Sequence, residues 1–358
     1  MFKYLITIYP LGMMYGSSGG FLSPENLVGR SRSKFPPDAA TLSGLFFSAN
    51  KVFTKNESED YISDEEPPEN KKPPRINQED LSKKLYVAGP FWSRHGAGKR
   101  DVFKFHLPIS KHRIISKSDS KTNEWRVVNG SWQLANKNNK DIKSDCQWQT
   151  VYSWNKSTTA IKNHTADSSP WQYVPILHPD LKLEERHVKE KDGLFLENAV
   201  QIPDDVCLTY LSTCRLPSGW YRFGGENHVV EIKSELIPKD ELFLDIFKQP
   251  IGRACALITP GMWGSNQLSL RYPQHPTFPK PKLMLTDKPV PYRSRLGGRM
   301  GRGRYAVPAG SVYVFDEPLN KSWWDWSEEW FPQEGYNLKK VGCGLCLPIE
   351  IEGINKRS

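Results

Sequence analysis

The residues best suited to chemistry form a stretch near the C-terminus, residues 292–304 (YRSRLGGRMGRGR). Glycine tolerates positive φ and lets backbone N–H groups approach an anion, while arginine offers a planar fork of donors that matches phosphate oxygens. Because the two residue types alternate along one loop, the sequence predicts a site that binds a sugar-phosphate backbone. The residues expected to bind are Arg295, Gly297, Gly298, Arg299, Gly301, Arg302, Gly303 and Arg304.

Other interpretations of this stretch lead to different functions. A flexible basic linker is the main alternative, but apolar, strand-like segments flank the stretch on both sides. No Gly-Lys-Ser/Thr ends it, so it is not a Walker loop, and no strand feeds it in the order that a dinucleotide-binding fingerprint requires. Nucleoside triphosphate binding is therefore disfavoured.

Two further segments are candidates for the same binding site. The first is a glycine-serine turn followed by a basic turn, and these would extend the groove if they lie beside the C-terminal loop; a solvated surface turn is the alternative. Its expected binding residues are Ser17, Ser18, Gly19, Gly20, Arg30, Arg32 and Lys34. The second is Trp263, which has no acidic neighbour in sequence and is expected to stack on an unpaired base.

A tryptophan cluster at residues 323–330 is expected to behave differently from Trp263. Aromatic faces can stack on bases, but Asp325, Glu328 and Glu329 within the cluster would repel phosphate. Tryptophan is also enriched at protein interfaces. The composition therefore favours a protein interface for this cluster, with a core position as the alternative.

Catalytic and metal-binding patterns are weak. His95 and His106 lie near Arg94, Lys99 and Arg100 in sequence, which makes His95 the best candidate base of a nuclease, with a solvated or phosphate-contacting histidine as the alternative. The pair Cys343 and Cys346 has the spacing of half a zinc site without a suitable second pair, although Cys207 and Cys214 could approach it in the fold. Buried thiols are expected instead. The sequence predicts no catalytic residue, no metal and no cofactor.

Composition restricts the class of protein. The chain has 358 residues, a formal net charge of +9 and six cysteines, without the density of a disulfide-rich secreted domain. The charge favours an anionic partner, and the unpaired thiols favour the cytoplasm. Apolar runs such as residues 4–9 and 254–259 are far shorter than the roughly 20 residues of a membrane-spanning helix, so a soluble protein is expected.

The pattern of elements predicts an α+β protein with mostly antiparallel strands. A first strand covers residues 4–9, and a helix follows Pro36-Pro37 over residues 38–47. Residues 54–84 and 116–169 read as polar insertions, the first disordered and the second a ribbon of short hairpins. Short strands are expected near residues 193–202, 206–210, 228–232, 253–259, 311–315 and 342–347, with a helix at 239–247.

Several segments, taken in order, resemble the Cas5-like RAMP subunit of type III-B CRISPR effectors, the third subunit of the Cmr complex. They are residues 35–44 (FPPDAATLSG), 193–195 (GLF), 224–226 (GGE), 257–261 (LITPG), 307–313 (VPAGSVY) and the closing glycine-rich strand that ends at Leu347-Pro348. Together they span nearly the whole chain. Residues 13–18 (MMYGSS) depart from the family's usual Phe-Arg-Asp-Gly-Arg-type run, so a variant type III complex, including a type III-D-like one, is the alternative.

The resemblance implies two packed ferredoxin-like, RRM-related RAMP modules with long insertions. They are expected at residues 1–180 and 181–358, the second carrying the 292–304 loop. It also implies a non-catalytic subunit that binds the 5′ repeat-derived tag of the crRNA, next to the Cas10-type large subunit and the first Cas7-like backbone RAMP subunit. Contact with target RNA would be indirect, because in that family the backbone subunits cut the target.

Two other functions remain open from the sequence. One is a metal-independent endoribonuclease that processes CRISPR repeat RNA. The other is a protein-docking subunit whose basic loop meets an acidic partner.

Overall fold

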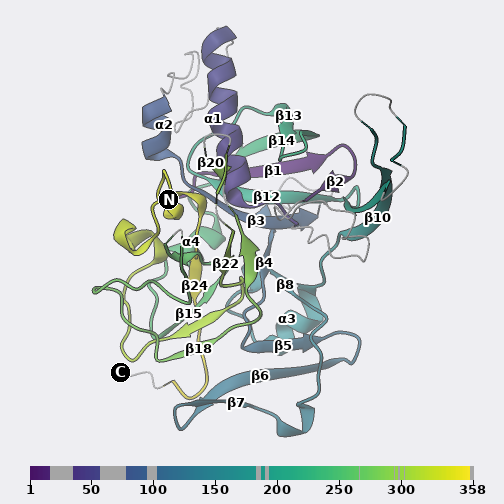
Figure 1. The fold of residues 1–358 in the computed structure, drawn as a ribbon. Helices are drawn as coiled ribbons and strands as arrows, with labels where there is room; N and C mark the ends of the chain where they lie inside the picture. Colours follow the sequence, from purple (N-terminus) through teal and green to yellow (C-terminus); the bar gives the residue numbers. More distant parts are fainter. Residues whose placement is uncertain are drawn as a thin grey trace.

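The computed structural model describes residues 1–16, 35–56, 78–94, 103–182, 187–189, 193–265, 267–293, 295–296, 299–301 and 303–354. The chain is α+β, as the sequence predicts, and antiparallel sheets dominate it (Figure 1). A search of these described residues for a helix long and apolar enough to cross a membrane finds none.

The largest sheet has eight strands and is built around the N-terminal strand. In spatial order they are β13 (Gly219–Phe223), β14 (His228–Leu236), β1 (Tyr4–Pro10), β12 (Val206–Ser212), β3 (Val87–Arg94), β4 (His106–Pro108), β8 (Trp148–Thr150) and β9 (Ala166–Asp167). Four antiparallel neighbours form its centre, in the spatial order β14-β1-β12-β3. Numbered by their order along the chain, these four strands have the spatial order 4-1-3-2. This is the strand order of a ferredoxin-like module.

The helices of this module only partly follow that pattern. Helix α1 (Ala39–Asn56) connects β1 to β3, and α2 (Gln78–Lys84) precedes β3. Between β12 and β14 the chain forms β13 in place of a second helix. The start of α1 is fixed to the sheet because the Tyr210 hydroxyl donates a 2.7 Å hydrogen bond to the Pro37 carbonyl. Ile6, paired with Tyr210 in the sheet, shares this face and is fully buried.

A second sheet repeats the order with four strands. They are β18 (Leu283–Leu285), β23 (Val312–Val314), β15 (Ala254–Leu257) and β24 (Cys346–Pro348), which stand second, third, first and fourth among themselves along the chain. Short 3-10 helices occupy the last connection: η5 (Trp323–Asp325), η6 (Glu328–Trp330) and η7 (Leu338–Val341). The two sheets thus share one topology, in agreement with two ferredoxin-like modules.

The two sheets also share one core, and a glycine lies at their junction. Gly342 ends η7 at φ 69°, and a Cβ there would lie 2.8 Å from the Val87 carbonyl and from the Ala88 Cα of β3. Only a residue without a side chain allows this approach. Since β12 and β14 pair with β1, the first sheet uses strands from both sides of the expected boundary at residue 180.

Both expected insertions contain regular structure. Residues 116–169 form hairpins as predicted, in the small sheet β5 (Arg113–Ser116), β6 (Lys121–Val128) and β7 (Ser131–Leu134), followed by η3 (Lys137–Asn139), η4 (Val151–Ser153) and α3 (Thr158–His164). The segment 54–84 was expected to lack structure, and this is wrong at both ends. Helix α1 continues to Asn56 and α2 begins at Gln78, where the buried Leu81 anchors it.

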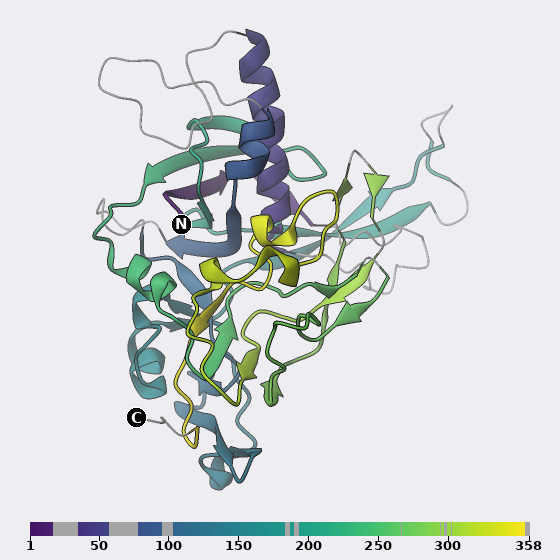
Figure 2. The same cartoon turned by 90° about the vertical axis from the view of Figure 1, so that its left-hand side faces the viewer.

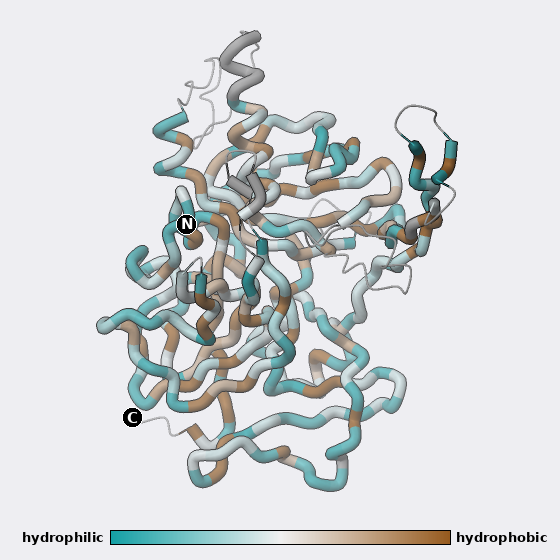
Figure 3. The backbone as a smooth tube through the Cα atoms, in the orientation of Figure 1, coloured by the Kyte–Doolittle hydropathy of each residue, from teal (hydrophilic) through white to brown (hydrophobic). Residues whose placement is uncertain are grey.

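A two-stranded arm projects from the body in both views (Figures 1 and 2). It consists of β10 (Gln172–Pro179) and β11 (Leu194–Gln201), and β11 also pairs with the short β2 (Met14–Tyr15). Hydrophobic residues are visible on the arm away from the main core (Figure 3).

The remaining elements are one helix and a group of short strand pairs. They are α4 (Leu242–Lys248), the pair β16 (Trp263–Gly264) and β17 (Ser269–Leu270), the pair β19 (Val290–Tyr292) and β22 (Arg304–Ala306), and the pair β20 (Arg295–Leu296) and β21 (Arg299–Met300).

Candidate nucleic-acid interface

The described residues of the glycine- and arginine-rich stretch form two antiparallel strand pairs, which together are called the hairpin below. At its base β19 pairs with β22, with Tyr292 opposite Arg304. Farther out β20 pairs with β21, with Leu296 opposite Arg299. An ordered antiparallel ladder replaces the flexible linker that was the main alternative, because backbone hydrogen bonds fix the register on both sides of the turn.

A side chain of the hairpin also ties its two strands together. The Arg293 Nε donates a 2.6 Å hydrogen bond to the carbonyl of Gly301. Gly303 is exposed, and a Cβ built on it meets no atom within 4 Å. The backbone at Gly303 is therefore open to an approaching ligand, while the strand pairing around it is held in place.

Arg304 was expected to bind phosphate, and the structure corrects this. Its side chain is 4% exposed, and its guanidinium forms an ion pair with Glu334 and donates to the carbonyl of Ser265. Burial lowers the pKa of Arg304. A guanidinium whose donors meet a buried carboxylate and a carbonyl is a structural anchor, so Arg304 holds the base of the hairpin.

The base of the hairpin lies close to the beginning of α1. Burial raises the pKa of the Tyr292 hydroxyl well above its usual value, and the nearby Asp38 carboxylate adds to this effect. Burial, and next to it Asp38, also raises the pKa of Tyr336, whose hydroxyl is hydrogen-bonded to Tyr292. The fold thus brings the segment before α1, which carries part of the family resemblance, to the C-terminal hairpin.

Trp263 was expected to stack on a base, and this is also wrong. The residue is 0% exposed, and its Nε1 donates a 2.9 Å hydrogen bond to the Tyr313 hydroxyl. Its ring packs on Phe331 with a centroid distance of 5.6 Å. The lack of acidic neighbours in sequence reflected a core position, because buried tryptophans avoid unpaired charges.

The aromatic residue that is exposed at the hairpin is Tyr305. It is 51% exposed and lies between two buried residues, Arg304 and Ala306, on β22. Tyr305 is not among the residues that the sequence predicts to bind. The signal that identifies it is the period-2 alternation of a strand, which places Tyr305 on the face opposite its neighbours.

The other predicted residues cannot all be placed. Arg295 and Arg299 lie on the paired strands β20 and β21. Gly301 accepts the hydrogen bond from Arg293. The remaining predicted residues lie outside the described part of the chain: Ser17, Ser18, Gly19, Gly20, Arg30, Arg32, Lys34, Gly297, Gly298 and Arg302.

The tryptophan cluster was interpreted as an interface and is instead core. Trp323, Trp326 and Trp330 are buried and pack with Phe278 and Phe331. The nearby acidic residues are compatible with this because Asp325, Glu328 and Glu329 are exposed. Asp325 ends η5 and accepts hydrogen bonds from the backbone N–H and the hydroxyl of Ser322.

Two of the candidate catalytic and metal-binding residues, His106 and Cys343, are buried in the protein. His95 lies outside the described residues, and His106 stacks on Trp92 at 3.7 Å. Burial lowers the pKa of His106 to about 4, so it is neutral at physiological pH. Cys343 exchanges hydrogen bonds with the backbone of Met262, and burial raises its pKa to about 12. Among the described residues, no group of three or more His, Cys, Asp or Glu is arranged to hold a metal ion.

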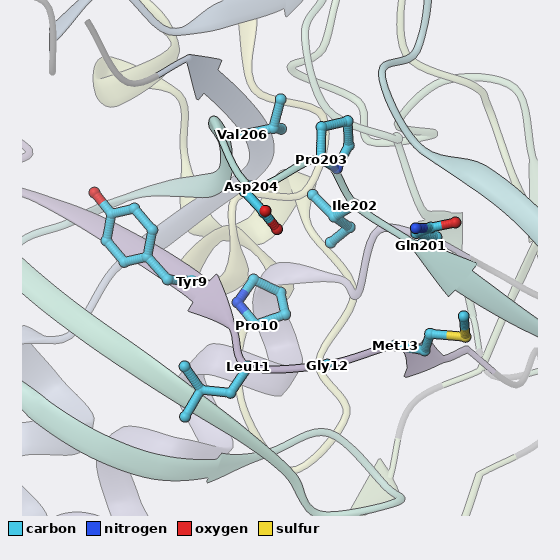
Figure 4. Close-up of a pocket in the computed structure, with 10 residues that line it drawn as sticks. All are labelled: Tyr9, Pro10, Leu11, Gly12, Met13, Gln201, Ile202, Pro203, Asp204 and Val206. Atoms are coloured by element: carbon cyan, nitrogen blue, oxygen red, sulfur yellow. The ribbon is translucent and has the colours of Figure 1, made fainter. Parts of the chain in front are cut away.

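A cavity of about 450 Å³ lies at the end of β1. Figure 4 shows the Asp204 carboxylate beside Ile202 on one side, and the chain from Leu11 to Met13 on the other. Polar and apolar atoms contribute about equally to its walls, and Gln201 and Asp204 are among the polar side chains. The carboxylate would repel a phosphate, so the cavity does not extend the basic hairpin.

Comparisons with known proteins give matches only among solved structures. No protein-family model and no curated protein matches the chain. A chain in the cryo-EM structure of the Type III-B Cmr-beta complex bound to cognate target RNA and AMPPNP is 12% identical, with a TM-score of 0.46, covering 87% of this chain and 86% of that chain.

Two further matches come from crystal structures. A chain of the Csm1–Csm4 cassette in complex with AMPPNP is 11% identical, with a TM-score of 0.41, covering 98% of both chains. A chain of the Csm3–Csm4 subcomplex of the type III-A CRISPR-Cas interference complex is 10% identical, with a TM-score of 0.42, covering 97% of this chain and 99% of that chain. The assignment of residues to the candidate site is based on the geometry of the hairpin and not on these matches.

Proposed function

We propose that the chain is a non-catalytic RNA-binding subunit of a cytoplasmic type III CRISPR effector complex, supporting antiviral defence. In this proposal it anchors and caps the 5′ repeat-derived tag of the crRNA. It contacts the Cas10-type large subunit and the first Cas7-like backbone RAMP subunit, and it meets target RNA only through the assembled particle. The motifs that resemble the Cas5-like RAMP subunit support the family, and the repeated ferredoxin-like strand order agrees with it.

The observation that carries the RNA-binding role is the anchored hairpin. A buried ion pair between Arg304 and Glu334 fixes its base, and β20 and β21 extend the ladder outward with Arg295 and Arg299 on them. Arginine on a fixed scaffold loses little conformational entropy when it binds phosphate, so preorganisation increases affinity. Arg295, Arg299 and Arg302 are the proposed phosphate contacts.

An unpaired base is proposed to stack on Tyr305. This exposed ring lies on the strand that leaves the hairpin, next to the buried Arg304. Base stacking on an aromatic face tolerates any base and adds to the backbone contacts. The combination suits a short single-stranded tag that is held by backbone contacts with limited base recognition.

Two described histidines of the N-terminal half, His106 and His112, are compatible with the proposed absence of catalysis. Burial lowers the pKa of His106 to about 4 and that of His112 to about 3. The Nδ1 of His112 lies 2.9 Å from the Ser110 hydroxyl inside the protein. Neither imidazole is placed or charged to protonate a leaving group on a bound RNA.

The direct test changes Arg299 and Arg302 together to Glu and measures the guide RNA that copurifies with the assembled complex. A matched control changes Lys137 and Lys140 to Glu, because these lysines are exposed on the β7–η3 segment and the charge change is the same. We expect the hairpin variant to lose most of the RNA and the control to keep it. Equal RNA content in the two variants would reject the hairpin as the anchor.

The number of phosphate contacts can be measured from the salt dependence of the binding of single-stranded tag RNA to the purified chain. Each phosphate contact contributes about 0.7 to the slope of log K against log salt concentration for a single strand. Removing two contacts should therefore reduce the slope by about 1.4 in the hairpin variant. The control variant should retain the slope of the unchanged chain.

A further inference from the structure

The arm formed by β10 and β11 has one mainly apolar face, and this face is exposed along β10. Along β10, every second residue from Tyr173 to Leu181 is exposed, while the residues between them are partly buried. The exposed residues of this row are Tyr173, Pro175, Leu177, Pro179 and Leu181. Such a row is the side of a strand that normally faces a core.

The partner strand continues the same face. Directly paired residues of antiparallel strands share a face, and here Leu177 pairs with Leu196 and Pro179 with Leu194. Asn198, opposite Pro175, is the single polar side chain of this group. Val188, bridged to Leu181 near the tip, is 46% exposed. No charged side chain lies on this face within the described residues of the two paired strands.

The arm carries several of the exposed large hydrophobic residues of the described chain. Five large hydrophobic residues with more than two fifths of their surface exposed belong to it: Tyr173, Leu177, Leu181, Val188 and Leu194. A two-stranded ribbon without a third strand or a covering layer is marginally stable in water. Within the described residues, the support from a third strand is at the root of the arm, where β2 pairs with Ala199 and Val200. Among the described residues, no further strand or helix is paired with β10, so its exposed apolar row is available to a covering surface.

The edge of the arm indicates how that surface approaches. Strand β10 is the outer strand of its sheet, in the order β10-β11-β2. Pro175 and Pro179 have no N–H and are tolerated in a paired strand only where the N–H position points to the free edge. The free edge of β10 thus lacks two donors, which disfavours the addition of another strand there. A partner is expected to pack on the face.

We propose that this arm is a docking element whose uncharged face packs against an apolar surface of another protein subunit. The lack of charge on the face complements an apolar protein surface and gives an RNA backbone no cation to bind. The proposal rests on the proposed function, because it is the effector particle that provides a neighbouring subunit. It assigns RNA binding and subunit docking to different parts of the chain.

The test uses a double variant of the full-length chain, Leu177→Asp with Leu194→Asp, produced together with the other subunits of its complex. Both side chains are already exposed, so the isolated chain should fold normally. The matched control is Leu236→Asp with Leu242→Asp, two exposed leucines elsewhere on the surface. We expect native mass spectrometry to show at least about tenfold weaker association of the arm variant with a protein subunit. The control should assemble normally.

A second measurement locates the contact. Hydroxyl-radical footprinting should oxidise Tyr173 and Leu177 in the free chain and spare them in the assembled particle. Unchanged oxidation on assembly would overturn the proposal, as would protection by naked guide RNA alone. Slower amide exchange along β10 without side-chain protection would mean strand addition instead. If the free chain is a dimer and the arm variant is a monomer, the face binds a second copy of this chain instead.

The outcome can be separated from that of the RNA-binding proposal. The arm variant should bind tag RNA with unchanged affinity as a purified chain, while the variant with Arg299 and Arg302 changed to Glu should dock normally and bind RNA weakly. If the arm variant assembles like the control, docking by the arm is refuted whether or not the hairpin binds RNA.

Discussion

The ion pair between Arg304 and Glu334 is predicted to be the main support of the hairpin base. Its two side chains are 4% and 11% exposed. Changing Glu334 to Gln leaves a buried guanidinium without its counter-charge, and breaking such a pair costs about 3–5 kcal/mol. Because Gln keeps one acceptor oxygen, the lower value of about 3 kcal/mol is expected.

The expected shift in melting temperature follows from chain length. At about 2.1 cal/mol/K per residue, 358 residues give an unfolding entropy near 0.75 kcal/mol/K, so about 3 kcal/mol corresponds to about 4 °C. Glu329→Gln is the control, since that side chain is 74% exposed and its removal should cost less than about 1 kcal/mol. Urea unfolding and differential scanning calorimetry of the purified variants measure both quantities.

A double replacement tests the physical reason. Changing Arg304 to Met and Glu334 to Leu removes both charges at similar volume, and stability should return to within about 1 kcal/mol of the unchanged chain. If Glu334→Gln is no more destabilising than Glu329→Gln, the pair does not support the hairpin. A double variant as unstable as Glu334→Gln alone would show that packing, and not the uncompensated charge, is responsible.

Two further predictions concern the core and pH. Gly344→Ala should destabilise the chain by about 3 kcal/mol, because φ is 58° and the new Cβ would lie 2.3 Å from the Trp263 ring. Gly44→Ala, with open space around it on α1, should stabilise the chain by about 1 kcal/mol. Chemical unfolding of the two variants measures both changes, and the opposite ranking would contradict the packing described. The pKa of His106 is lowered from 6.5 to about 4, so the unfolded chain binds more protons in that window and stability falls as pH decreases from about 6.5 to 4. Between pH 7 and 5 the unchanged chain should lose about 2 kcal/mol more than His106→Gln, and equal losses would show that this imidazole is not buried as a neutral group.

Much of the fold follows from local patterns in the sequence. The strands near residues 4, 206 and 228 and the helix after Pro36-Pro37 were predicted because their apolar runs and helix-start residues are local signals. The helix at α2 was missed, since Leu81 is its only fully buried residue and its flanks are polar and proline-rich. The pairing of β12 and β14 with β1 joins strands about 200 residues apart, which local periodicity does not encode.

The candidate site shows the same division between local and tertiary information. Composition identified the hairpin at residues 292–304, because alternating Gly and Arg is a local pattern. Composition did not identify Arg304 as a buried anchor, because its partners Glu334 and Ser265 come from other parts of the fold. Likewise Trp263, expected to be exposed, is buried because it packs against Tyr313 and Phe331, contacts that its local sequence does not reveal.

The most direct measurement of the central claim is ultraviolet crosslinking of the guide RNA that copurifies with the complex, with the crosslinked peptides identified by mass spectrometry. The predicted result is crosslinks within residues 290–306, including Tyr305, that disappear when Arg299 and Arg302 are changed to Glu. Crosslinks confined to other parts of the chain, with none in this hairpin, would contradict its role as the RNA anchor.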